Sequence, residues 1–484
     1  MTAPVDVAAG NAAPRTAVLA TVVLIAALLL GAGLVLVLGD FYGEETALAI
    51  LVGVLAVAPV IVRVCQGKFD PFEPITIVSA VYLLYFSLAP LFRISSTDFS
   101  WLGRDWRPLY VRGLTAVSAP ILLTWVGYSL PLGGRIGQRL SRPMIMTEVG
   151  NRTLRRFGWA LTASAVLGLA AWSAISGTRV TRFLLPGLLA GSTQGEGGGP
   201  DIQYLFMTME WFVPAFMLLC TAGAFKRTVV RMAYWVMVLI LYLSIAFRYR
   251  LIVFVIAGVM IYYLRRDKRP NMLLVIPVGA ATFVALGWVS MVRGYFNSYG
   301  RQGSLTFSWA TLLKSALADT RIFETFTAVL TAVPDFFGHV GMLPFYYLFL
   351  IPIPRFLWHA KPEPSWIRMV GPAIGTPEAF VAGAAFPSFG EYYMALGWTG
   401  VVAGMLLFGI LLRVLWEWYR TDRFDPARQA IFAICYVWTL QVIIRGYLAQ
   451  IVMEFCFFVL PAIVAMVIAR RSERRHQVRQ WRAS

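Results

Sequence analysis

Hydrophobic residues form long runs along most of this chain, separated by short polar segments. A helix needs about 20 apolar residues to cross a hydrocarbon core of roughly 30 Å, and runs of this kind recur from Thr16 to Ala469. We predict twelve transmembrane helices, at roughly 16–38, 46–64, 74–92, 113–132, 157–176, 203–225, 232–247, 251–264, 271–292, 394–412, 429–444 and 451–469. The expected fold is an all-α polytopic membrane protein.

Residues 293–393 form the longest interruption of this pattern, and they are rich in proline, aromatic residues and paired charges. Spanning a bilayer does not require so long an insert, so we expect it to contain the functional chemistry. Its apolar part, Gly341–Trp358, is broken by three prolines and is predicted to be interfacial or re-entrant. The chain is thus divided into helices 1–9 (1–292), the insert (293–393), helices 10–12 (394–469) and a basic tail (470–484).

Basic residues give the chain a formal net charge of +18, and most lie in short loops between the apolar runs. Lys and Arg in such loops favour the cytoplasmic side, so both termini are predicted to be cytoplasmic and the insert extracytoplasmic. Insertion topology and anionic lipid headgroups account for the charge, and no nucleic-acid partner is expected. Arg93, Arg104, Arg107 and Arg112 are an exception on the outer side: either the topology is locally wrong or they bind an anionic ligand.

The residue types that bind metals are scarce and scattered. The four cysteines show no paired spacing, and no two of the three histidines have ligand spacing. We therefore expect no metal and no cofactor. The sequence has no D-x-D motif, so a glycosyl donor, if there is one, would not be a nucleotide sugar bound through a metal.

Arginines at turns between apolar runs are the first candidate binding residues. Arg248 and Arg250 flank Tyr249 in one turn, and Arg293 and Arg445 are predicted on the same face. Arginine at membrane depth usually pairs with an anion or faces a cavity. One interpretation is a fork that binds a lipid-linked phosphate or diphosphate, and the other is that these side chains snorkel to the interface.

Glu391 and His359 are the candidate proton acceptors. Glu391 lies directly before a predicted span, in Pro387-Ser388-Phe389-Gly390-Glu391-Tyr392-Tyr393, where burial would fix its depth. A structural role that braces an arginine is the alternative. His359 and also His339 have the chemistry for proton transfer, although a packed histidine is the simpler interpretation. Glu210 and Glu454 lie inside predicted spans and are expected to pair with arginines.

Several of these segments resemble one known family. The run Ile353-Pro354-Arg355-Phe356-Leu357-Trp358 with Lys361-Pro362, the Pro387–Tyr393 motif and Leu396-Gly397-Trp398-Thr399-Gly400 are similar to segments of bacterial oligosaccharide repeat-unit polymerases, the O-antigen polymerase (Wzy-type) family. Arg248–Arg250 and Arg445-Gly446 resemble the arginine-bearing turns of that family. The resemblance covers about 240–465; Tyr249, which splits the arginine pair, and the long aromatic insert depart from the family pattern.

The resemblance implies a GT-C-like, metal-independent glycosyltransferase in the bacterial cytoplasmic membrane. Its donor would be a glycan on undecaprenyl diphosphate, transferred to a new lipid-linked repeat unit on the outer face. Besides this substrate and membrane lipids, a flippase and a chain-length regulator are partners that this interpretation allows. The alternatives are an O-antigen ligase-like or other lipid-linked glycan transferase, and a flippase or transporter for lipid-linked oligosaccharide.

Overall fold

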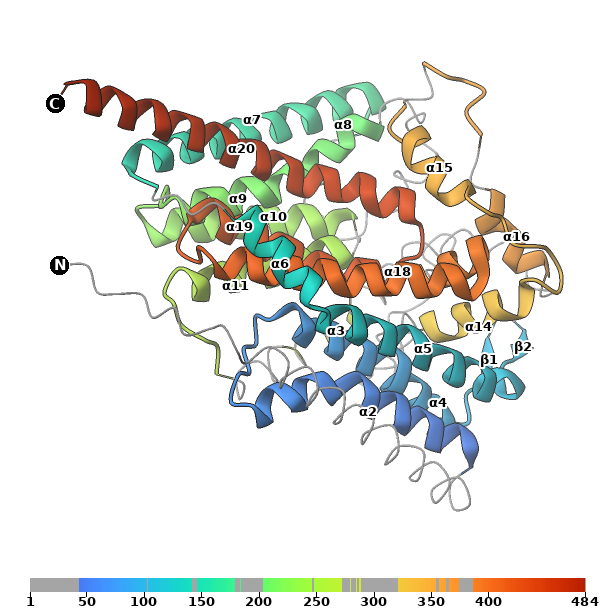
Figure 1. Cartoon of the computed structure of the whole chain (residues 1–484). Helices are drawn as coiled ribbons and strands as arrows, with labels where there is room; N and C mark the ends of the chain where they lie inside the picture. The colour runs from blue at the N-terminus through green and yellow to red at the C-terminus, as the bar shows by residue number, and fades with distance from the viewer. Residues whose placement is uncertain are drawn as a thin grey trace.

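The computed structural model shows a bundle of helices (Figure 1). Its described part contains a single β-hairpin, with two residues in each strand. The described residues are 43–101, 103–141, 146–178, 183, 203–245, 248–271, 279, 284, 287–288, 321–353, 357–362, 365–373 and 386–483. Strand β1 (Ser100–Trp101) pairs antiparallel with β2 (Arg104–Asp105), with Ser100 opposite Asp105.

The helices of the first half are α2 (Glu44–Cys65), α3 (Pro74–Leu83), the π-helical η1 (Leu84–Leu88), α4 (Ala89–Ser96), the 3₁₀ turn η2 (Arg107–Leu109), α5 (Tyr110–Ser129), α6 (Pro131–Leu140) and α7 (Glu148–Ser176). They are followed by α8 (Gln203–Met207), the 3₁₀ turn η5 (Thr208–Trp211), α9 (Phe212–Thr221), α10 (Thr228–Ile245), α11 (Arg248–Leu264), α14 (Ile322–Ala332), α15 (Leu343–Leu350), α16 (Ser365–Ala373), α18 (Ser388–Arg420), α19 (Pro426–Ile444) and α20 (Leu448–Ala483). Pro74, Pro131 and Pro426 each begin a helix, where a missing N–H costs no hydrogen bond.

Eight helical segments in the described part are long and apolar enough to cross a membrane. They coincide with eight of the predicted spans, and the shorter apolar helices Thr228–Ser244 and Arg250–Leu264 coincide with two more. The predicted spans at 16–38 and, for the most part, 271–292 lie outside the described residues. The chain is therefore an all-α, multi-pass membrane protein, while the full count of twelve stays a prediction.

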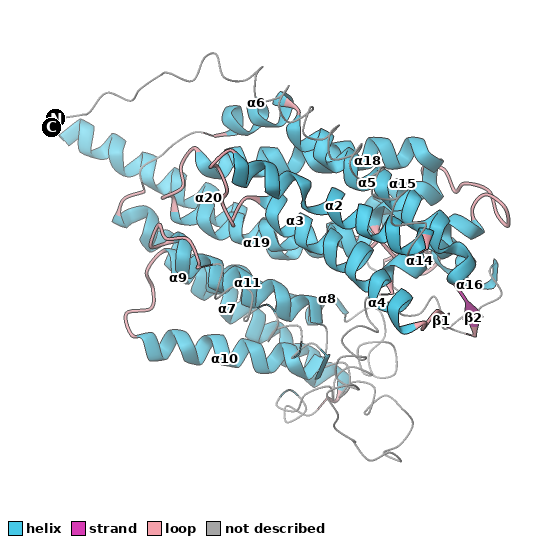
Figure 2. Cartoon of the chain, turned by 90° about the horizontal axis from the view of Figure 1, so that it is seen from below, coloured by secondary structure: helices cyan, strands magenta, loops and turns pink. Residues whose placement is uncertain are grey.

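The buried apolar side chains form two clusters. One gathers α7, α9, α10, α11, α19 and α20, and the other gathers α2, α3, α5, α14, α16 and α18. Figure 2 shows α7, α9, α10 and α11 on one side of α19 and α3, with α5 and α18 on the other side. We call the end of the bundle where α18 begins the Glu391 end, and the end where α20 finishes the tail end; they lie at opposite sides of Figure 1.

Helices α5 and α18 pack backbone to backbone through glycines. A Cβ atom at Gly127 of α5 would lie 2.2 Å from the Leu406 carbonyl oxygen of α18, and one at Gly409 would lie 2.2 Å from the Thr124 oxygen. No side chain fits at such distances, so the two helices approach as small residues allow in membrane proteins. This contact fixes the position of α18, on which Glu391 lies.

Helix α18 has a break in its helical geometry near its start, and the insert forms hydrogen bonds with the helix there. Leu396 and Gly397 leave helical geometry, and Gly397 has φ 64° and ψ −149°. The carbonyl groups of Met394 and Ala395 then accept hydrogen bonds from the N–H groups of Val340 and Gly341, both at 2.9 Å. Residues 388–393, which precede the predicted span at 394, are thus already helical, because α18 begins at Ser388.

Replacing Gly397 by alanine is expected to lower the free energy of unfolding by about 1–3 kcal/mol, because this φ/ψ region is essentially restricted to glycine. The new Cβ would also lie 3.1 Å from His339 Cε1. Thermal unfolding in detergent measures the effect. Gly338→Ala is the matched control, because no atom lies within 4 Å of its Cβ position; equal melting temperatures for both variants would contradict the prediction.

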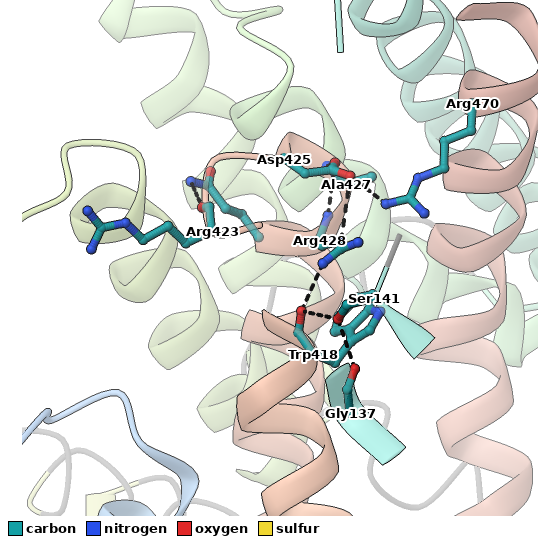
Figure 3. A network of polar contacts seen from close by, with 9 residues as sticks. Gly137, Ser141, Trp418, Arg423, Asp425, Ala427, Arg428 and Arg470 are labelled. Atoms are coloured by element: carbon teal, nitrogen blue, oxygen red, sulfur yellow. Dashed lines mark hydrogen bonds and ion pairs between the residues drawn. The ribbon is translucent and has the colours of Figure 1, made fainter. Parts of the chain in front are cut away.

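A polar network closes the tail end (Figure 3). Asp425 caps α19 by accepting from the N–H groups of Ala427 (2.8 Å) and Arg428 (3.3 Å), and its other oxygen binds Arg470 of α20 at 2.8 Å. The fully buried Arg428 donates to the Trp418 carbonyl of α18 at 2.9 Å. The network ties α18, α19 and α20 together at the end remote from Glu391.

Candidate functional site

Glu391 lies in the first turn of α18 and is completely buried. Its Oε1 accepts a hydrogen bond from Trp366 Nε1 of α16 at 3.2 Å, and its Oε2 accepts from the N–H of Leu448 at 2.6 Å. Leu448 is the first residue of α20, so the carboxylate stands at a helix N-terminus, where a negative charge is favoured. The side chain thus braces a helix end rather than an arginine.

Two further contacts hold the α18 start against the turn between α19 and α20. Ser388 Oγ donates to the Arg445 carbonyl at 2.9 Å. A Cβ at Gly446 would lie 2.5 Å from the Pro387 carbonyl oxygen, so only glycine permits this approach. The structure therefore brings the Pro387–Tyr393 motif and the Arg445-Gly446 turn, more than 50 residues apart in the sequence, into direct contact.

Aromatic rings pack against Trp366, the side chain that donates to Glu391. The Tyr347 ring of α15 lies 5.5 Å from Trp366 and 6.3 Å from Tyr447, measured between centroids. Lys361 is buried and donates from Nζ to the carbonyls of Ile351 (3.0 Å) and Ile353 (2.9 Å), just after α15 ends. The Lys361-Pro362 element of the resemblance thus caps the end of α15. It also fixes Tyr347 of this helix, whose hydroxyl donates to the Pro362 carbonyl at 2.9 Å.

His359 has a different environment from Glu391. It is exposed in the turn that follows α15, and no contact found in the described residues joins it to Glu391. His339, by contrast, is fixed by a 3.1 Å contact between Nδ1 and the Tyr393 carbonyl. Since a carbonyl can only accept, Nδ1 carries the proton in this contact. The structure therefore brings Glu391 and the Arg445 turn together, and it leaves His359 apart from them.

Arg250 is buried and forms an ion pair with the fully buried Glu210 of η5. Its guanidinium also lies over the Phe206 ring, 5.8 Å from the centroid. Glu454 of α20 is close enough to act electrostatically on Glu210. The expectation that Glu210 pairs with an arginine is confirmed, and Arg250 does not snorkel to the surface.

Helices α11 and α19 run antiparallel, since Gln429 Nε2 near the start of α19 donates to the Leu264 carbonyl at the end of α11 at 3.4 Å. Their other ends, with Arg250 and Arg445, are therefore at similar height in the bundle. Arg445 is half-buried at the end of α19. Arg293 lies outside the described residues, and for Arg248 only the backbone is described.

Two of the four arginines that the sequence pattern places on the outer side, Arg93 and Arg112, contact helix α14 of the insert. Arg93 is buried and pairs with Glu324 of α14, which also accepts from Tyr110 Oη at 2.8 Å. Arg112 donates to the Leu330 carbonyl at 2.9 Å. Burial lowers the pKa of Arg321, and the nearby Arg93 charge acts in the same direction. Arg93 of α4 and Arg112 of α5 thus dock α14 on these two helices.

Sequence reasoning missed Trp366, Glu324 and the Leu448 N–H as partners in these contacts. The available signal for Glu324 was an acid in an apolar run, which demands a buried cation. Trp366 and Leu448 offered none, because a tryptophan and a backbone amide are common everywhere. Each oxygen of Glu391 accepts one hydrogen bond and retains a lone pair, so a substrate hydroxyl could donate to either oxygen. A hydroxyl could reach it only if a covering group moved.

Comparison of the chain with protein-family models, with curated proteins and with solved structures gave no match.

Proposed function

We propose that this chain is a membrane glycosyltransferase that polymerises oligosaccharide repeat units carried on undecaprenyl diphosphate, in the bacterial cytoplasmic membrane. The observation that supports this most is the joining of the Pro387–Tyr393 motif to the Arg445-Gly446 turn through Glu391 and Ser388. Both elements are among the segments that resemble the family.

In the proposed reaction, a hydroxyl of the acceptor repeat unit attacks the anomeric carbon of the donor glycan. The new C–O bond forms as the bond to the diphosphate breaks, and the electron pair leaves with the diphosphate. Arg445, with Arg248 and Arg293 as further candidates, would stabilise that negative charge. Glu391 would take the proton of this hydroxyl, and Trp366 and the Leu448 N–H would orient the Glu391 carboxylate.

The orientation follows from the same proposal. The Glu391 end would face the outside, where the lipid-linked substrates are used, and the tail end would be cytoplasmic, as would both termini. A flippase and a chain-length regulator would be partners of such an enzyme. We also propose, from the family resemblance, that the chain has a GT-C-like architecture.

The test is to incubate purified protein with lipid-linked repeat units and to look for a ladder of longer glycans. Glu391→Gln is expected to lower the rate about 10²–10⁴-fold while donor binding stays within a few-fold of wild type. Trp366→Phe removes one donor to Oε1 and is expected to slow the reaction less. Asp335→Asn changes an exposed acid elsewhere in the insert and is the control.

The outcomes separate the possibilities. A ladder from wild type together with full turnover by Glu391→Gln would exclude Glu391 as the base, and loss of turnover in His359→Ala would then assign that role to His359. Transfer of a single glycan without a ladder would indicate a ligase. Movement of lipid-linked substrate across vesicles without any new bond would indicate a flippase. Melting temperatures of all variants show whether a loss of activity is merely a loss of fold.

A further inference from the structure

Helix α20 extends well beyond the thickness of a bilayer. Its 36 residues span about 54 Å at 1.5 Å per residue, against a hydrocarbon core of roughly 30 Å. Counted from Leu448, Arg470 lies about 33 Å along the axis and Arg475 about 40 Å. The segment from Arg470 to Arg475 therefore falls at the level of the polar headgroups when Leu448 lies at the opposite boundary.

Two buried contacts hold this segment in place. Glu473 is completely buried and accepts from the N–H groups of Thr147 (3.2 Å) and Gly150 (3.0 Å) at the start of α7. Arg470 binds Asp425 at 2.8 Å, as Figure 3 shows. These contacts fix the rotation of α20, so its exposed side chains at this level are held in a fixed orientation.

That outward face is basic and partly apolar. Arg471, Arg474 and Arg475 are exposed, with Val478 50% and Trp481 79% exposed beyond them. Arg152 and Arg156 on the adjacent first turns of α7 are exposed too. None of these five arginines forms an ion pair with any described residue. We call this set, from Arg152 to Trp481, the tail-end basic face.

We propose that the tail-end basic face binds the phosphate groups of anionic phospholipids in the adjacent leaflet. The basic residues of the face are all arginines, whose planar forks suit phosphate. Two helices bring them to the depth at which lipid phosphates lie. Exposed apolar side chains near a basic cluster are typical of segments that rest on a lipid surface. A soluble acidic protein would not require the arginines to follow the membrane boundary on both α7 and α20.

The experiment compares spin-labelled phosphatidylglycerol with spin-labelled phosphatidylcholine around the full chain in bilayers. Wild type is expected to prefer phosphatidylglycerol, and Arg471→Gln/Arg474→Gln/Arg475→Gln is expected to lose most of this preference, roughly fivefold for each arginine at the headgroup level. High salt should weaken the wild-type preference. The control triple variant Arg265→Gln/Arg266→Gln/Lys268→Gln removes equal charge from an exposed loop.

Equal losses in both triple variants would overturn a specific site and leave only a diffuse charge effect. No loss in the tail variant would overturn the proposal outright. A photoreactive residue at position 478 gives a second measurement in cell membranes: adducts with lipid support the proposal, and adducts with an acidic protein contradict it. Neither measurement depends on glycan synthesis, so failure here is distinct from failure of the proposed function.

Discussion

Arg250→Met is expected to lower the free energy of unfolding by roughly 3–5 kcal/mol, because it leaves the carboxylate of Glu210 buried without its cation. Glu210 is 0% exposed and Arg250 is 5% exposed, so water cannot replace the lost partner. Glu454 of α20 is a second acidic residue in the same region. Unfolding in mixed micelles and the yield of folded protein would both show the effect.

The double variant Arg250→Met/Glu210→Gln should recover most of this loss, since neither residue is then a buried, uncompensated charge. Arg266→Met, at an exposed position, is the control. The double variant also separates structure from function: if it is stable but makes no polymer, the pair has a role in the reaction, and if it polymerises normally, the pair is structural. A single variant as stable as wild type would contradict the ion pair itself.

Gly409→Val is expected to separate α5 from α18, with a loss of about 3 kcal/mol or more, at or above the upper end of what overpacking costs. The Cβ would lie 2.2 Å from the Thr124 oxygen and 2.7 Å from the Tyr128 nitrogen, both backbone atoms that cannot rotate away. Because Glu391 stands on α18, glycan transfer should fall together with the melting temperature.

Gly134 provides the comparison for Gly409. The nearest atom to a Cβ there is 3.9 Å away, so Gly134→Ala should be neutral. If Gly409→Val melted at the wild-type temperature, the close approach of α5 and α18 would be wrong. Gly127→Ala tests the same interface from the other helix, and we expect it to be destabilising as well.

The helices were predictable because apolar length alone distinguishes a span from a loop. Helices α2, α5 and α19 lie close to the predicted positions, whereas α18 begins six residues before 394 because polar Ser388 and Glu391 are buried within its first turn. A hydropathy pattern assigns such polar residues to a loop, because it does not show that they are buried. The insert was predicted as a single region, but the buried helix α14 within it could not be placed without knowing that Arg93 pairs with Glu324.

The site was predictable only in part. Glu391 stood out as an acid at a span boundary, and Arg445 as a lone arginine at a turn, but their proximity depends on how α18, α19 and α20 pack. The Arg250–Glu210 pair shows the same limit: each residue was noted as unusual at membrane depth, while their pairing is tertiary information. His359 was a candidate by residue type alone, and its exposed position follows from the end of α15, which the sequence pattern does not mark.

Helix α20 contacts Glu391 at its first residue and the tail-end network about 33 Å further along its axis. Its first N–H holds the carboxylate at 2.6 Å, and its far end is clamped through Arg470 and Glu473. An axial slip by the rise of one residue, about 1.5 Å, would lengthen the first contact beyond hydrogen-bonding range. Pro461, inside α20, is a point at which the helix can bend and absorb part of such a slip. Only the part of a tail displacement that this bend does not absorb would reach the N–H that binds Glu391.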